Sequence, residues 1–317
     1  MKDNRKFDDS FFDEDAYSFI RSISTPDDDT PEKNPHKKRY AVIFLILFSV
    51  VFVAVVRHTY LNNDDTQTEN INNYTYIPQT SDTPQKIFTE TEIDEKLQLL
   101  SQSDTRCKTI YENKEVYPND MLQAVCRNPE IVDFAVGYLT SDGTSGGGLT
   151  EDDINEDVPL FIQWDSRWGY VPYGDNVIGL SGCGPTCLSM VAVSLTGDLK
   201  YSPEYISSYS AKHGYYEESS GTAWALFTEG CRDFGLKSGE VPLNYNSMVN
   251  ALDDGKLIIC SMNPGDFTAV GHFIVIKGID ENGDFFINDP NSVGRSSRVW
   301  SYEELEWQIR NIWFFNT

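Results

Sequence analysis

Residues 179–190 read GLSGCGPTCLSM, and this stretch decides the expected fold. Glycines on both sides of Cys183 allow a sharp backbone turn, and Pro185 suits the first turn of a helix, where its missing N–H costs nothing. The apolar run that follows, broken only by small residues, predicts a helix over 186–195. Cys183 is therefore expected just ahead of a helix N-terminus. Unpaired N–H groups there favour a thiolate and can stabilise an oxyanion, as a nucleophilic cysteine requires.

A buried, unreactive cysteine at a tight turn would fit the same stretch, because free cysteines are commonly core residues. The supply of a general base decides between the two interpretations, and histidine is the usual choice. Of the four histidines, His36 and His58 flank an apolar segment described below. His213 is expected near a helix end, as a capping or surface group. His272 remains as the candidate base.

His272 opens an apolar, β-branched run, and a second apolar run ends at Asp289. Between them, residues 281–284 read ENGD, and Asn-Gly between two apolar runs is a strong hairpin signal. A hairpin brings the start of its first strand beside the end of its second. We therefore expect His272 and Asp289 to meet, an arrangement in which a carboxylate orients an imidazole.

Four motifs follow one another along the chain: Gln163-Trp164-Asp165, then GCGPT at 182–186, GHF at 271–273 and NDP at 288–290. In this order they resemble the C39-like family of papain-fold cysteine peptidases, over roughly residues 158–315. The resemblance implies Cys183 as nucleophile, His272 as base and Asp289 as orienting residue. It also implies that the Gln163 side chain helps to form the oxyanion hole.

The family resemblance implies an α+β, papain-like peptidase domain, here over 158–317, in which a helical part carries the cysteine and an antiparallel sheet carries the histidine and the aspartate. The order of expected elements agrees, because helices, including one over 221–231, come first and strands at 257–262, 272–280, 285–290 and 312–315 follow. No Cys or His spacing resembles a zinc site, so neither a metal nor a cofactor is predicted. No ATP-binding motif accompanies the domain, which favours the stand-alone kind of family member.

Residues 40–56 form a run of 17 residues without a charge. A membrane span needs about 17–25 such residues. Basic residues at 37–39 precede the run, which orients the N-terminus toward the cytoplasm. The sequence thus predicts a disordered cytoplasmic tail over 1–39, one transmembrane helix over 40–57, and everything after it outside the cytoplasm.

Three segments are expected between the membrane and the peptidase domain. Residues 58–86 are polar and predict a solvated spacer. Residues 87–140 predict a helical accessory segment, with an Asn-Pro corner at 128–129. Residues 141–157 are acidic and glycine-rich, which is typical of a flexible linker.

All six cysteines follow the predicted membrane segment, where disulfides are permitted. Cys107 and Cys126, both in the helical accessory segment, are the only pair we consider for a disulfide. Cys187 and Cys260 are interpreted as core thiols, because one lies a helical turn after Cys183 and the other within an apolar strand.

The predicted function is that of a membrane-anchored, extracytoplasmic cysteine peptidase acting on a peptide or protein substrate. The net charge of −24 argues against a nucleic-acid partner, since phosphate binding needs clustered Lys and Arg. Two alternatives stay open: a peptidoglycan amidase or endopeptidase, and a non-catalytic surface-binding module on a peptidase fold. The sequence predicts no particular oligomeric state.

Overall fold

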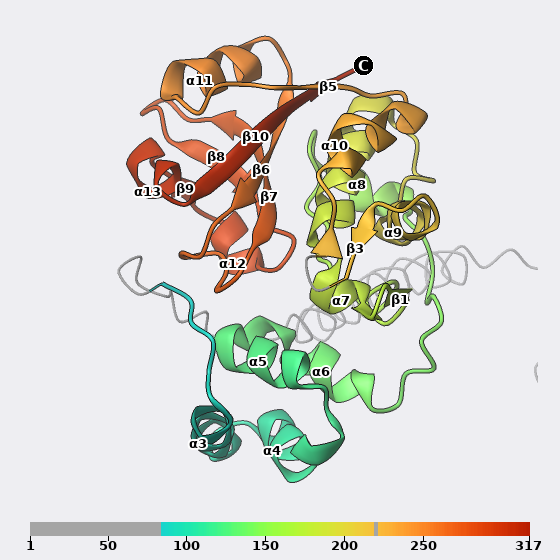
Figure 1. Cartoon of the computed structure of the whole chain (residues 1–317), viewed down its shortest axis with the longest axis vertical. Coiled ribbons are helices and arrows are strands. Elements are labelled where there is room, and N and C mark those ends of the chain that lie inside the picture. The colour runs from blue at the N-terminus through green and yellow to red at the C-terminus, as the bar shows by residue number, and fades with distance from the viewer. Residues whose placement is uncertain (1–83, 219–220) are drawn as a thin grey trace, which may run out of the picture. The chain divides into compact units, whose positions relative to one another are not determined.

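The computed structural model describes residues 84–218 and 221–317 (Figure 1). The predicted cytoplasmic tail, the predicted transmembrane helix over 40–57 and nearly all of the predicted spacer lie outside the described residues. Within 84–218 and 221–317, no helix has the length and apolar character needed to cross a membrane. The membrane anchor therefore stays a prediction from the sequence.

The accessory segment is helical, as its apolar periodicity predicts. Its elements are α3 (Glu90–Ser101), α4 (Thr105–Glu112), η1 (Lys114–Val116), α5 (Asn119–Arg127), η2 (Pro129–Ile131) and α6 (Val132–Tyr138). Thr89 and Glu92 close a capping box at the start of α3, which satisfies two N–H groups at that end. At the Asn-Pro corner the Asn128 side chain accepts from the backbone N–H of Glu130. The helices enclose a small core of their own, which includes Leu97, Ile110, Met121, Ile131 and Phe134.

A six-stranded antiparallel sheet is formed by strands from the C-terminal part of the chain. In spatial order it contains β5 (Lys237–Glu240), β10 (Ile309–Asn316), β6 (Leu257–Met262), β7 (His272–Ile279), β8 (Phe285–Asn288) and β9 (Val299–Trp300). The four predicted strands correspond to β6, β7, β8 and β10, and the predicted hairpin joins β7 to β8. The short edge strands β5 and β9 have no counterpart in the prediction, because two to four residues carry too little alternation to indicate a strand.

Helices cover both faces of this sheet (Figure 1). One face packs on α8 (Cys183–Thr196), with α7 (Ile178–Ser181), α9 (Pro203–Lys212), α10 (Ala225–Thr228) and η4 (Gly230–Phe234) around it. The other face packs on α11 (Tyr245–Asp253) and α13 (Tyr302–Glu306), and α12 (Val293–Ser296) follows β8. Two apolar cores result, one on each face of the sheet. The mixed helix and antiparallel-sheet class is the one expected.

Two short hairpins and one 3-10 turn complete the fold: β1 (Pro172–Tyr173) with β2 (Asn176–Val177), β3 (Tyr216–Glu217) with β4 (Gly221–Thr222), and η3 (Glu151–Ile154). The prediction of one helix over 221–231 is wrong. Gly221 has φ 78°, a left-handed conformation that ends a turn and enters a strand, so the helix begins only at Ala225.

The structure answers one open question and corrects one expectation. Cys107 and Cys126 are both free thiols, buried in the core of the helical segment, so the disulfide considered between them is not formed. Residues 141–157 do not run free of the domain. The N–H of Gly146 donates to the carbonyl of Arg167 at 2.7 Å, and the Ser145 hydroxyl donates to Glu204 at 2.5 Å.

Candidate active site

Cys183 is the first residue of α8, with Gly182 as the residue that precedes the helix. The helix thus begins three residues earlier than the apolar run predicts. Gly184 has no room for a side chain, because a Cβ there would lie 2.7 Å from Thr222 on β4. Thr222 is in turn held by the Tyr173 hydroxyl at 2.9 Å. Close packing of β4 against the first turn of α8 therefore fixes the position of Cys183, which remains partly exposed.

His272 and Asp289 meet at the open end of the hairpin, as its geometry predicts. The Nε2 atom of His272 donates to Oδ1 of Asp289 at 2.7 Å, and both side chains are buried. His272 is the first residue of β7, and Asp289 directly follows the last residue of β8. Because Nε2 is engaged with the carboxylate, Nδ1 is the nitrogen left to exchange a proton.

The charges of this pair support each other. Burial lowers the pKa of His272, but the Asp289 carboxylate, followed by the Cys183 thiol, outweighs burial and raises this pKa to about 9. Burial raises the pKa of Asp289, but Arg295 and His272 outweigh it and lower this pKa to about 2. At neutral pH the pair is therefore an imidazolium and a carboxylate, with Cys183 within electrostatic reach of the imidazole.

Arg295 is a member of the site that the sequence motifs do not indicate. Its Nε donates to Oδ2 of Asp289 at 2.5 Å, and the backbone N–H of Asn291 donates to Oδ1 at 2.8 Å. Arg295 lies on α12 and is itself buried. A usable signal exists, since Arg295 is the first basic residue after Lys277 and a buried carboxylate needs a cation or several donors.

Gln163 links the two halves of the site. Its side-chain Nε2 donates to the carbonyl of Gly179 at 2.9 Å, on the short helix just before Cys183. Its backbone N–H donates to the carbonyl of Pro290 at 2.8 Å, directly after Asp289. The side-chain bond joins two segments of the protein and does not itself contact a substrate. An amide nitrogen has two N–H groups, so one remains for the predicted oxyanion role.

His213 differs from His272 in its chemistry. It caps the C-terminal end of α9, is exposed, and places its Nδ1 2.8 Å from the carbonyl oxygen of Tyr209. The ring stacks on that of Tyr209 at a centroid distance of 4.0 Å. The expectation of a capping or surface histidine is confirmed.

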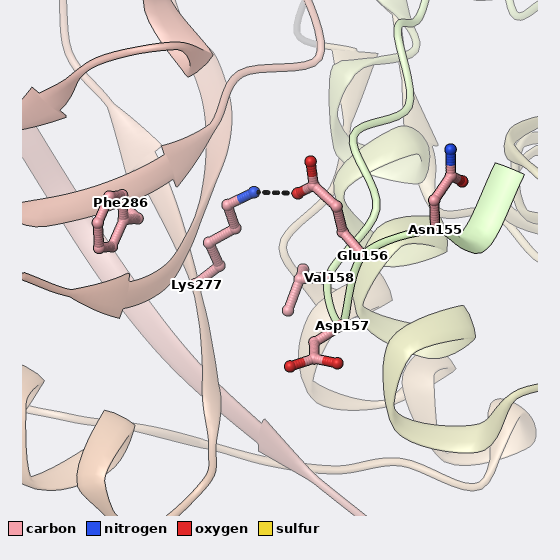
Figure 2. Close-up of a pocket in the computed structure, with 6 residues that line it drawn as sticks. All are labelled: Asn155, Glu156, Asp157, Val158, Lys277 and Phe286. Carbon is pink, nitrogen blue, oxygen red and sulfur yellow. Dashed lines mark hydrogen bonds and ion pairs between the residues drawn. The ribbon is translucent and has the colours of Figure 1, made fainter.

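The pocket in Figure 2 offers little catalytic chemistry. It is lined by Asn155, Glu156, Asp157, Val158, Lys277 and Phe286. None of these is a predicted site residue, and its one cation, Lys277, pairs with Glu156 at 3.0 Å. Among residues 84–218 and 221–317, no three His, Cys, Asp or Glu side chains are grouped so as to hold a metal ion.

The chain belongs to the Peptidase_C39 like family, whose sequence model matches residues 155–313. The match contains all four predicted site residues and Arg295. Helices α3 to α6 precede it and lie outside the matched range. A comparison with curated proteins finds no significant match. Residues 155–313 therefore form a C39-like cysteine peptidase domain.

Proposed function

From this family membership we propose that the protein hydrolyses peptide bonds through a thioester on Cys183. His272 transfers the protons and Asp289 orients its ring. The observation that carries the proposal is the buried 2.7 Å hydrogen bond between His272 and Asp289, beside a partly exposed cysteine at the start of a buried helix. A buried histidine kept only for packing would gain nothing from a carboxylate that must itself be neutralised by Arg295.

The steps follow from the positions of these groups. The Cys183 thiolate attacks the scissile carbonyl carbon, and the oxygen becomes an oxyanion held by the Cys183 backbone N–H and by the free N–H of Gln163. The His272 imidazolium then gives its proton to the leaving amine, and the C–N bond breaks. Water loses a proton to His272 and attacks the thioester, which releases the acid and restores the thiolate.

We propose further that the active domain lies outside the cytoplasm, anchored by residues 40–57. The uncharged run and the basic residues before it support this arrangement. Proteolysis of intact cells with an added protease tests it. Loss of the segment after residue 57, with the tail before residue 40 protected, agrees with the proposal, and protection of both segments contradicts it.

The decisive experiment compares Cys183→Ala with Cys187→Ala in the full chain. Each removes one sulfur from the same helix, but Cys187 is wholly buried. We expect Cys183→Ala to abolish hydrolysis of a peptide library and Cys187→Ala to retain it. Hydrolysis by Cys183→Ala at the wild-type rate would exclude the mechanism. Turnover of purified cell wall in place of the peptides would identify the substrate as peptidoglycan.

A further inference from the structure

The helical segment and the residues just before it lie outside the family match, and they contact chain segments close to three proposed site residues, Cys183, His272 and Asp289. Ahead of α3, the N–H of Gln85 donates to the carbonyl of Gly265 at 2.8 Å, in the loop before His272. At the Asn-Pro corner, Nδ2 of Asn128 donates to the carbonyl of Asn291 at 2.5 Å, in the loop after Asp289. From α6, the Phe134 ring packs so closely on Gly179 that a Cβ there would lie 2.3 Å from the ring.

Glu130 makes the most specific of these contacts. Its Oε1 accepts from the Ser292 hydroxyl at 2.5 Å, and its Oε2 accepts from the backbone N–H of Val293 at 2.8 Å. The Ser292 hydroxyl in turn accepts from the N–H of Arg295 at 3.0 Å. One carboxylate of the helical segment thus fixes the first turn of α12.

Helix α12 carries the cation that neutralises Asp289. The Nε atom of Arg295 bonds Asp289, but its Nη2 is buried and has no hydrogen-bond partner among the described residues. The Phe267 ring lies 5.9 Å from the guanidinium and adds little directional hold, so the position of Arg295 depends on where α12 begins. Asp289 then passes this constraint to His272 through their 2.7 Å bond.

We propose that Glu130 is a positioning residue for the active site, acting through α12 and Arg295 to hold Asp289 against His272. This inference rests on the proposed function for its meaning but concerns a different part of the chain. The helical segment is, on this basis, a working part of the enzyme and not only a spacer. Loss of Glu130 loosens the hydrogen bond between His272 and Asp289 and leaves the residues that contact the substrate in place.

The test measures the alkylation of Cys183 by iodoacetamide between pH 5 and pH 10 in the full chain, read by peptide mass spectrometry. The charged or titratable groups around His272 are Asp289 after β8, Cys183 on α8 and, behind Asp289, Arg295 on α12. In Glu130→Ala the loosened imidazolium stabilises the thiolate less, and we expect the rate at pH 7 to fall about tenfold, equivalent to about 1.4 kcal/mol. At pH 10 the rates should converge, because the His272 imidazolium, whose pKa is about 9, is then largely lost in both proteins. With a peptide substrate, kcat should fall and KM should not change.

Glu92→Ala is the matched control. Like Glu130, Glu92 is a carboxylate of the helical segment that accepts a backbone N–H at a helix start. Its helix is α3, however, and its partners are Thr89 and Lys86 and not residues near the site. Its alkylation profile should match the wild type. Glu130→Gln keeps an acceptor oxygen for Ser292 and should recover most of the rate. If Glu130→Ala does not fold, Glu130→Asp decides, since its shorter side chain keeps the charge but loses the reach.

An unchanged alkylation profile in folded Glu130→Ala or Glu130→Asp would overturn the inference. So would an equal fall in Glu92→Ala, which would assign the effect to general stability of the segment. The proposed function fails separately: a wild-type protein that hydrolyses neither peptide nor cell wall contradicts the peptidase, whereas the alkylation profiles still decide the role of Glu130.

Discussion

The end of the β7–β8 hairpin and the end of α9 each hold a histidine bonded to an oxygen. His272 contacts a carboxylate at 2.7 Å and is buried, whereas His213 contacts a neutral carbonyl at 2.8 Å and is exposed. A buried carboxylate favours the imidazolium strongly, and an exposed carbonyl competes with water. A histidine therefore becomes a candidate base through the charge and burial of its partner, not through the presence of a hydrogen bond.

The largest effect should come from His272→Ala. It removes the group that accepts and returns protons, and such groups contribute about 10²–10⁴-fold to a rate. We expect kcat/KM for peptide hydrolysis to fall by that factor. A cooperative thermal unfolding transition should show that the variant still folds. Activity within a few-fold of the wild type would show that His272 has a structural role only, and that it does not differ from His213 in function.

Gln163→Ala should come next. Removal of one oxyanion donor costs about 10²–10³-fold in kcat. The same change removes the bond from Nε2 to the Gly179 carbonyl, so the thermal midpoint must be measured beside the rate. A loss of kcat at a temperature where the variant is fully folded supports the oxyanion role. A loss that follows unfolding would leave Gln163 as a link between the loops.

Asp289→Asn keeps the shape of the contact and removes its charge. The pKa of His272 should then fall from about 9, so that the alkaline limb of kcat/KM moves to lower pH. A return of this pKa to its ordinary value of 6.5 would lower the imidazolium population at pH 8 by about thirtyfold, and kcat/KM with it. Arg295 is left buried without its partner, a loss that costs about 3–5 kcal/mol in comparable buried pairs. An unchanged pH profile would contradict the charge argument.

The same pKa values predict how stability depends on pH. The folded pKa of His272 lies above its ordinary value of 6.5, so its stabilisation is complete below 6.5 and is lost as the pH rises through about 9. The folded pKa of Asp289 lies below 3.8, so its stabilisation is complete above 3.8 and is lost as the pH falls through about 2. Thermal melts should show both losses more strongly in the wild type than in Asp289→Asn, where the other carboxylates with lowered pKa values still contribute to the acid loss.

The smallest effect should come from His213→Ala. An exposed residue that makes no contact with the site changes stability by only about 0.5 kcal/mol or less. Its kcat/KM should equal that of the wild type across the pH range. A loss similar to that of His272→Ala would mean that α9 takes part in the reaction and that the distinction between the two histidines is wrong.

The hairpin could be predicted from the sequence because its signals are local. The ENGD turn and the apolar runs on both sides determine which residues meet, and this places Asp289 beside His272. The predicted start of α8 is three residues too late, since glycines around Cys183 suggest a turn when read alone. Only the packing of Thr222 on Gly184 shows why glycine is needed inside the first helical turn.

The role of Glu130 could not be predicted in the same way. Glu130 meets Ser292 across 162 positions of the chain, and no periodicity connects residues so far apart. The sequence also left open whether Cys107 and Cys126 form a disulfide, for a related reason. Both thiols are placed by helices that bury them in an apolar core, and their closeness in the sequence says nothing about the direction of their side chains.

Helix α8 is expected to open very rarely compared with the surface segments of this domain. Ten consecutive residues, from Gly184 to Val193, are buried between the sheet and the surrounding helices. A helix of this kind opens only when the whole domain unfolds, whereas surface segments open locally at much lower cost. The amide hydrogens of its middle turns should therefore be among the slowest in the molecule to exchange with solvent. Cys183 is thus attached to one of the least mobile elements, so that motions of its partners, rather than its own, set how often the reacting groups are aligned.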